Sequence, residues 1–417
     1  MSDVRRPEDP HGAAEALDGL DELLRRIPGA SKIVGEVRDL RALLVQSRVP
    51  RVAALGRRGA GKSALGNALL GVNQLAVGAV EDTTREAALH TLTVQGRALD
   101  WVDTPGLRAG DAPTRREAVR GCLLATRPDA VLLCFRASEV GAGLDEDVAT
   151  MRAVLQGVER LAGGAPRCLA VVTRVDELAP RRVKAPPYDQ VEAKRAAIEA
   201  AVGAVRRGLA AQGLSVDDVV PVGAYQRFDA DGAREVDWRW NLETLSVRLF
   251  ELLPREAQLE AARAIERGWV LRRRVAMRLV GAATSVAMAV GATPLPVADL
   301  ALLVPLQAAM LSGVVYASGR RLGPRTLTEW LGGLGLGAGL GMALREAVRA
   351  VLRVVPAIGT TVSGAVAASG TWALGVAAVR HFVDGASVAE SRARFDEALA
   401  AGPGDETEAP DEGEGEP

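Results

Sequence analysis

Residues 56–63 read Gly56-Arg57-Arg58-Gly59-Ala60-Gly61-Lys62-Ser63 and match the complete pattern GxxxxGK[ST]. An apolar run over 52–55 precedes this segment and is typical of a buried strand, and an amphipathic pattern over 62–71 follows it and is typical of a helix. A glycine-rich turn between a strand and a helix lets backbone N–H groups surround phosphate oxygens. The residues expected at the nucleotide phosphates are Gly56, Gly59, Ala60, Gly61, Lys62, Ser63 and Ala64.

The composition of the 417-residue chain indicates two domains whose cores are built from small apolar residues. Apolar residues make up 48% of the chain and aromatic residues only 3%, so Ala, Val, Leu and Gly must supply most of the packing. The segment 402–417 holds seven acids and no base, which is typical of a disordered tail. Cys122, Cys134 and Cys168 lack metal-ligand spacing and are expected to be buried thiols in a reducing compartment. The N-terminus lacks the apolar core of a signal peptide, so we expect the first half to be cytoplasmic.

Strand and helix signals alternate between residues 51 and 252, which predicts an α/β domain with a mainly parallel sheet. The candidate strands are 51–55, 88–95, 98–102, 130–135, 168–173 and 219–222, of which the second and third are expected to form a hairpin. After Pro254 the sequence indicates only helices broken by Gly and Pro. The predicted fold class is an α/β P-loop NTPase followed by an all-α apolar helical domain. The predicted parts are a disordered start with helices (1–47), a nucleotide-binding domain (48–254), a helical domain (255–400) and a disordered acidic tail (401–417).

Two segments after the phosphate loop are expected to complete a Mg²⁺ site. Asp103-Thr104-Pro105-Gly106 follows the strand 98–102, and an Asp at a strand end of a P-loop NTPase holds Mg²⁺ through water. The N–H of Gly106 is then placed to meet the γ-phosphate. Thr83 and Thr84 lie in a polar loop, where a Thr can ligate Mg²⁺ and sense the γ-phosphate; we choose Thr84, although an ordinary loop role stays open. The predicted metal ligands are Ser63, Thr84 and Asp103.

Two later segments are expected to read the base. Thr173-Arg174-Val175-Asp176 follows the strand 168–173 at its carboxyl end. A carboxylate there accepts two N–H bonds from the guanine edge, and adenine offers no such pair, so Asp176 would select GTP. Val222-Gly223-Ala224 ends the last predicted strand, where a backbone N–H can bond the guanine oxygen. The predicted base-site residues are Thr173, Arg174, Asp176, Gly223 and Ala224.

These five segments together resemble the translation-factor-class, Era-like GTPases over about half of the chain, residues 51–252. The resemblance implies binding of GTP and GDP with Mg²⁺, and hydrolysis of GTP in which Lys62 and Thr84 are the candidate catalytic residues. It also implies that Thr173, Asp176 and Ala224 read the base.

Three positions bear on hydrolysis and specificity, of which the third is shared by Era-like members and departs from Ras-like proteins. Arg174 stands where the family has the Lys whose stem packs on the base, and an Arg stacks as well, so guanine preference should survive. Gly59 replaces the Asn of potassium-activated members, which argues against stimulation by K⁺. Leu107 stands where Ras-like proteins carry the Gln that orients water. We therefore expect slow turnover that a partner or self-association accelerates. For Arg58 three roles stay open: contact with the γ-phosphate, obstruction of an incoming arginine, or exposure to solvent.

The helical half contains four long uncharged runs with arginines at their ends. The runs are 279–298, 300–319, 330–344 and 354–379. Their length permits membrane spans, the flanking arginines suit anionic headgroups, and the small residues permit close helix packing. The runs are nevertheless rich in Ala, Gly, Thr and Ser, and an apolar helix is equally compatible with the centre of a soluble bundle. Membrane lipid contact through 279–319 and 354–379 and a soluble helical bundle both stay open.

This half also resembles a known bacterial module of unknown function, the YcjF-like domain. One signature is Thr293-Pro294-Leu295-Pro296-Val297-Ala298-Asp299 with 306–310, and the other is Val355-Pro356-Ala357-Ile358-Gly359-Thr360-Thr361 with 371–375. The resemblance covers roughly 265–385 and implies association with the inner membrane.

Two functions follow from these expectations. The first is a Mg²⁺-dependent GTPase switch that controls a helical, membrane-associated domain, with the nucleotide-binding domain at the inner face of the membrane or, alternatively, in the cytosol. The second is a membrane-anchoring or remodelling scaffold, similar to dynamin-like or immunity-related GTPases, with weak hydrolysis. The expected partners are a guanine nucleotide, lipid, a second copy of the chain or an activating protein. Since no basic, aromatic-interleaved patch follows the first domain, no nucleic acid is expected.

Overall fold

The computed structural model describes residues 35, 37–38, 40–41, 44–75, 88–94, 96–107, 113–141, 143–292, 298–320, 324–334 and 364–403. The chain divides into two compact units. The α/β unit comprises 49–254 together with 264–268, and the helical unit comprises the residues up to 48, 255–263 and those from 269 onward. Thr83, Thr84, the Pro294-Leu295-Pro296 turn, the acidic tail and most of the predicted N-terminal helices lie outside the described residues.

The α/β unit is built on a six-stranded sheet whose order is β2-β3-β1-β4-β5-β6. The strands are β1 (Arg51–Gly56), β2 (Ala88–Val94), β3 (Arg97–Asp103), β4 (Ala130–Arg136), β5 (Cys168–Thr173) and β6 (Val219–Pro221). The edge strand β2 runs antiparallel to β3, and every other pair is parallel. The predicted mainly parallel α/β fold, including its hairpin, is thereby confirmed.

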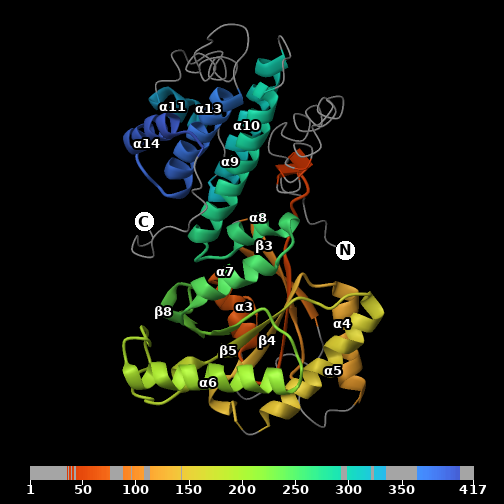
Figure 1. Ribbon diagram of the computed structural model, residues 1–417. Helices are drawn as coiled ribbons and strands as arrows, with labels where there is room; N and C mark the ends of the chain where they lie inside the picture. The colour runs from red at the N-terminus through yellow and green to blue at the C-terminus, as the bar shows by residue number, and fades with distance from the viewer. Residues whose placement is uncertain are drawn as a thin grey trace. The chain divides into compact units, whose positions relative to one another are not determined.

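Helices cover both faces of this sheet (Figure 1). They are α3 (Lys62–Leu70), α4 (Pro113–Thr126), α5 (Leu144–Ala162), α6 (Glu192–Ala211) and α7 (Leu242–Leu252). Alternate strand residues such as Leu55 and Leu133 pack in one core cluster with Met151 of α5 and Ile198 of α6. The helix α3 packs on the opposite face, where a Cβ at Gly66 would lie 2.8 Å from the ring of Trp101. This arrangement gathers the carboxyl ends of the parallel strands at one edge, where ligands of open α/β sheets bind.

A second, two-stranded sheet in the α/β unit was not predicted from the sequence. It consists of β7 (Gly223–Phe228) and β8 (Arg234–Trp240), which pair antiparallel. The Val222-Gly223-Ala224 segment therefore does not end the last strand of the main sheet: β6 stops at Pro221 and Gly223 opens a new strand. Residues of β7 alternate between more and less exposed positions, but Tyr225 falls on the exposed face and Phe228 on the other, so the period of a half-buried strand is hidden in the sequence.

The helical unit contains only helices among its described residues, in agreement with the predicted all-α fold. The helices are α8 (Arg255–Ala264), α9 (Trp269–Ala292), α10 (Ala298–Ser318), α11 (Pro324–Gly333), α13 (Gly364–Ala378), the π-helical turn η3 (Val379–Val383) and α14 (Val388–Ala401). The backbones of α9 and α13 approach closely, since a Cβ at Gly375 would lie 2.5 Å from Cγ1 of Val280. A buried hydrogen bond of 3.0 Å from Gln307 to Thr371 joins α10 to α13.

One helix of the described residues, Trp269–Gly291, is long and apolar enough to cross a membrane by length and composition. Its mean hydropathy over the most apolar 18 residues is 1.2, and 67% of that stretch is buried. Burial of this extent is also what the central helix of a soluble bundle shows. This helix is therefore compatible both with membrane contact and with a soluble helical bundle.

Candidate nucleotide-binding site

The loop between β1 and α3 depends on its glycines for different reasons. Gly59 and Gly61 both have φ of +77°, a left-handed conformation that costs an L side chain roughly 1–2 kcal/mol. Gly56 is instead required by space, because a Cβ there would lie 2.5 Å from the carbonyl oxygen of Cys134 on the neighbouring strand. The two glycines that the pattern fixes, and Gly59 between them, therefore all shape the loop before α3.

Lys62 is the first residue of α3 and is only 8% exposed. Its Nζ donates hydrogen bonds to the carbonyl oxygens of Gly56 at 3.3 Å and Arg57 at 3.1 Å, so its charge lies within the curve of the loop. The first turn of α3 is closed by the bond from the N–H of Leu65 to the carbonyl of Gly61 at 2.8 Å. An ammonium group and free N–H groups at a helix N-terminus form an anion-binding site.

Ser63 and Asp103 meet beside this helix N-terminus. The hydroxyl of Ser63 donates a bond of 2.6 Å to Oδ2 of Asp103, which is 3% exposed at the end of β3. The next residue, Thr104, donates from its hydroxyl to the carbonyl of Ala54 at 2.6 Å and so holds the segment on β1. A hydroxyl and a carboxylate oxygen are hard donors of the kind that Mg²⁺ prefers beside phosphates, so these two residues fit the metal. The third predicted ligand, Thr84, lies outside the described residues.

The segment after Asp103 lies directly against the phosphate loop. A Cβ at Gly106 would overlap the backbone of Arg58, so only glycine fits this approach. The N–H of Leu107 donates to the carbonyl of Gly56 at 3.1 Å, and the Leu107 side chain is 2% exposed in the core cluster. Leu107 therefore serves packing, and no side chain at this position is available to orient a water molecule.

The two arginines of the phosphate loop differ in their surroundings. Arg57 donates to Asp147 of α5 at 2.6 Å and to the carbonyl of Gly143 at 3.3 Å, whereas Arg58 is exposed. Burial raises the pKa of Asp147, and the hydrogen bond from Arg57 opposes that rise. Sequence reasoning missed this pair because 90 residues separate its members. Arg57 thus fixes the loop to α5.

A pocket of about 350 Å³ opens beside the loop and collects most of the predicted base-site residues. Of the predicted residues it is lined by Gly61, Ala64, Thr173, Arg174, Asp176 and Ala224. It is also lined by residues that were not predicted: Asn67, Asn73, Glu177, Tyr225, Gln226 and Phe228. Three of these belong to the β7–β8 hairpin, whose existence the sequence did not reveal. Gly223 is not among the lining residues.

The Asp176 carboxylate stands on a short turn after β5 that other residues hold in place. Burial raises the pKa of Asp176, and a hydrogen bond from its own backbone N–H opposes the rise. The ammonium of Lys194 donates to the carbonyls of Asp176 at 2.8 Å and Leu178 at 2.7 Å. Arg174 has φ of +55° and pairs with Glu177 at 2.8 Å. The turn therefore places the half-buried Asp176 carboxylate at the pocket.

Thr173 ties this turn to the phosphate loop. Its hydroxyl oxygen lies 2.8 Å from the carbonyl of Ala60 and 3.2 Å from the carbonyl of Phe135, and the residue is 1% exposed. The structure thus brings the phosphate-loop residues, Asp103, Gly106 and the turn of Thr173 and Asp176 to one edge of the sheet. Within the described part of the chain, no group of three or more His, Cys, Asp or Glu side chains has metal-binding geometry.

The first part of the chain is similar to known GTPases. Residues 51–162 match the family model described as "50S ribosome-binding GTPase". The curated protein GTPase Der of Desulforamulus reducens is 34% identical over 137 residues, which cover 31% of this chain and 29% of that protein. The tRNA modification GTPase MnmE of Magnetococcus marinus is 28% identical over 171 residues, covering 39% of this chain and 34% of that protein. The predicted resemblance of the first domain to Era-like GTPases is confirmed, and the YcjF-likeness of the helical half stays a prediction.

The chain spans only about a third of the length of the curated relatives that it matches. Among solved structures, Era in complex with MgGDPNP and 16S ribosomal RNA has a TM-score of 0.32 and 19% identity, covering 50% of this chain and 58% of that one. Toc33 from Arabidopsis thaliana with GDP and Mg²⁺ has a TM-score of 0.33 and 19% identity, covering 49% and 83%.

Proposed function

We propose that this chain, which carries a domain of the 50S ribosome-binding GTPase family in residues 51–162, binds GTP with Mg²⁺ and hydrolyses it to GDP. The observation that supports this most is the convergence of two sites at one edge of the sheet. Lys62 and the hydrogen-bonded pair Ser63 and Asp103 lie together at the loop, and the pocket of about 350 Å³ with Asp176 adjoins the same loop.

Each residue has a distinct task in this proposal. The ammonium of Lys62 and the N–H groups of the loop bind phosphate oxygens, and Ser63 and Asp103 hold Mg²⁺. The bound Mg²⁺ neutralises the charge that develops on the phosphates. Asp176 accepts the N–H groups of the guanine edge. Because Leu107 is buried, the chain itself offers no water-orienting side chain there, and we propose slow turnover that a partner or a second copy accelerates.

Competition between nucleotides tests this proposal. The full chain is titrated into a fluorescent GTP analogue, unlabelled GTP and ATP are used as competitors, and phosphate release is followed. GTP should displace the analogue at far lower concentration than ATP, and Lys62→Ala should abolish binding. Equal displacement by the two nucleotides, or no binding of either, would overturn the proposal.

The finer proposal is that the nucleotide state controls the helical unit at a membrane. It is supported by α9, whose length and hydropathy suit a span. The alternative, a membrane-anchoring scaffold with weak hydrolysis, is favoured by the same helix together with the buried Leu107. Flotation of the full chain with anionic liposomes, in GDP and in a non-hydrolysable GTP analogue, separates these cases. Flotation only with the GTP analogue supports the switch, flotation with both supports the scaffold, and no flotation removes the membrane from either.

A further inference from the structure

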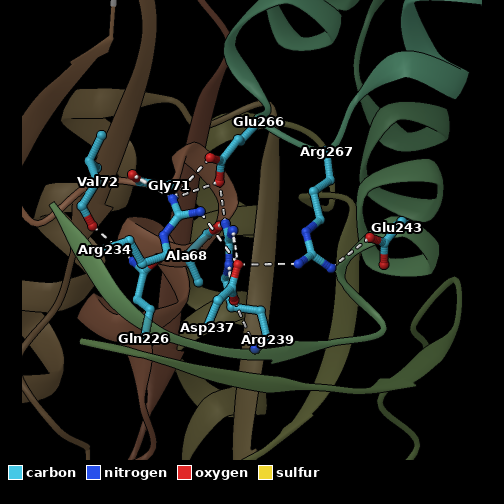
Figure 2. A network of polar contacts seen from close by, with 10 residues as sticks. All are labelled: Ala68, Gly71, Val72, Gln226, Arg234, Asp237, Arg239, Glu243, Glu266 and Arg267. Atoms are coloured by element: carbon cyan, nitrogen blue, oxygen red, sulfur yellow. Dashed lines mark hydrogen bonds and ion pairs between the residues drawn. The ribbon is translucent and has the colours of Figure 1, made fainter. Parts of the chain in front are cut away.

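The end of α3 that lies away from the phosphate loop is held by side chains and backbone from distant parts of the α/β unit (Figure 2). The last carbonyls of a helix have no partner within the helix, and α3 has no basic residue in its last turn. Two carbonyls of its last turn accept bonds of 2.9 Å from outside, Ala68 from Arg239 and Leu69 from the N–H of Glu266. The two residues after the helix accept similar bonds, Gly71 from Arg234 at 3.0 Å and Val72 from Gln226 at 2.9 Å.

The arginines that hold α3 are themselves fixed by acids. The Arg239 side chain is 1% exposed; it donates to Asp237 at 2.6 Å and 2.8 Å, and it also pairs with Glu266. Arg234 donates to the same Glu266 carboxylate at 2.9 Å and 3.0 Å. Burial opposes ionisation of Asp237, yet its hydrogen bonds from Arg239 keep the pKa of Asp237 well below the usual value. A buried guanidinium requires such partners, because losing one leaves a charge without compensation.

The fit around Glu266 is close. Gly71 has φ of +69°, and a Cβ at this position would overlap the Glu266 carboxylate and the Arg234 guanidinium. The glycine that ends α3 therefore leaves room for the acid that holds it. Arg267, the next residue, pairs with Asp237 at 3.2 Å and with Glu243 at 3.1 Å. The segment 264–268 is thus attached to α3 and to the β7–β8 hairpin at several points.

Glu266 lies in a short segment of the α/β unit between two stretches of the helical unit. Residues 264–268 belong to the α/β unit, although residues 255–263, which form α8 up to its last residue, and α9, which begins at Trp269, belong to the helical unit. Lys62 and Ser63 are the first residues of α3, and Glu266 contacts the other end of the helix. The nine residues of α3 span about 14 Å.

We propose that Arg239 and Glu266 are positioning residues for the nucleotide site: they hold the C-terminal end of α3, and nucleotide binding at Lys62 and Ser63 in turn tightens the hold on segment 264–268. The inference rests on the proposed nucleotide binding. Binding free energies are reciprocal, so whatever Glu266 contributes to nucleotide affinity, the nucleotide contributes to the order of 264–268. The β7–β8 hairpin joins the two, because it supplies Arg234, Arg239 and Gln226 to α3 and also lines the base pocket.

The test compares Glu266→Gln with Glu243→Gln in the full chain. Both changes remove one carboxylate from the same network, but only Glu266 contacts the arginines that bind α3. We expect Glu266→Gln to weaken Mg²⁺·GDP binding by about fivefold or more and Glu243→Gln to leave it unchanged. Conservative Glu266→Asp should restore part of the affinity.

A second readout separates positioning from general stability. Hydrogen–deuterium exchange of the peptide that covers 264–268 includes the N–H of Glu266, which donates to the carbonyl of Leu69. In the wild type, Mg²⁺·GDP should slow exchange there, and in Glu266→Gln this protection should be lost. If the wild type binds no nucleotide, the proposed function fails. If it binds normally, but exchange at 264–268 ignores nucleotide or Glu266→Gln binds as tightly as the wild type, the positioning role is overturned.

Discussion

The hydroxyl of Ser63 donates a hydrogen bond of 2.6 Å to Oδ2 of Asp103, which joins the first turn of α3 to the carboxyl end of β3. The two residues are 40 positions apart in the chain: Ser63 lies on the helix after β1, and Asp103 is the last residue of β3, which pairs parallel with β1. Their contact places a hydroxyl and a carboxylate beside the phosphate loop. The first prediction follows from this contact.

Replacement of Ser63 by Ala should remove the benefit that Mg²⁺ gives to nucleotide binding. We expect Ser63→Ala to bind GDP about tenfold or more weakly in Mg²⁺, because the hydroxyl that contacts the charged metal ion is lost. In EDTA the variant should bind GDP as tightly as the wild type. Isothermal titration calorimetry in the two buffers measures both values. The exposed Ser215→Ala is the control, and an equal loss in EDTA would contradict a metal-binding role.

Asp176→Asn should change the base that the pocket prefers. The carboxylate accepts two N–H groups of guanine, whereas an amide both donates and accepts. Xanthine carries a carbonyl in place of the 2-amino group, so it suits the amide. We expect GDP affinity to fall at least about tenfold and xanthosine diphosphate to bind better than GDP. Competition against a fluorescent guanine nucleotide gives the ratio, and an unchanged ratio would exclude Asp176 as the base reader.

Guanine binding should weaken as the pH is lowered, and the loss should begin at a higher pH than it would for a carboxylate with an ordinary pKa. Burial raises the pKa of Asp176 above its usual value, and only the ionised form accepts both N–H groups. Affinity is therefore complete above the raised pKa and decreases as the pH falls through it. The residual GDP affinity of Asp176→Asn should lack this step, which separates the carboxylate from titration of the phosphates. Coincident pH profiles would contradict the assignment.

Gly71→Ala should destabilise the α/β unit more than Gly96→Ala does. Both glycines have positive φ, +69° and +77°, so each substitution carries a backbone cost of roughly 1–2 kcal/mol. Only at Gly71 does the added methyl group overlap Glu266 and Arg234, whereas nothing lies within 4 Å of a Cβ at Gly96. Urea denaturation measures the difference. Equal midpoints would mean that the contact with Glu266 yields without cost.

Gly375→Ala should lower the thermal stability of the helical unit. A Cβ at Gly375 would lie 2.5 Å from Val280 on α9, and such overpacking typically costs about 1–3 kcal/mol. Gly281→Ala, on α9 with nothing within 4 Å of its Cβ, should instead be neutral or stabilising by up to about 1 kcal/mol through helix propensity. Differential scanning calorimetry of the full chain reads both, and similar shifts for the two variants would contradict the close packing of α9 and α13.

The main sheet and the phosphate loop were predictable because their signals are local. An apolar run, a glycine pattern and an Asp at a strand end each lie within a few consecutive residues, as at Gly56, Lys62 and Asp103. The β7–β8 hairpin was missed because the aromatic residues of β7 do not share one face: Tyr225 is exposed, whereas Phe228 is half-buried. The role of Arg239 has no local signature either, since the carbonyl that it binds is 171 residues away.

The attachment of Glu266 bears on how such a chain can be divided and recombined. A cut at Pro254, where the strand signals end, would separate the first domain from Glu266 and Arg267 and leave the buried Arg239 guanidinium with Asp237 as its remaining carboxylate among the described ion pairs. A fragment intended to fold as the first domain therefore needs the stretch up to Gly268. Exchange of the helical half between related proteins, in the laboratory or in evolution, must therefore keep the segment 264–268. Otherwise Glu266 and Gly71, which are in close contact, must be replaced together.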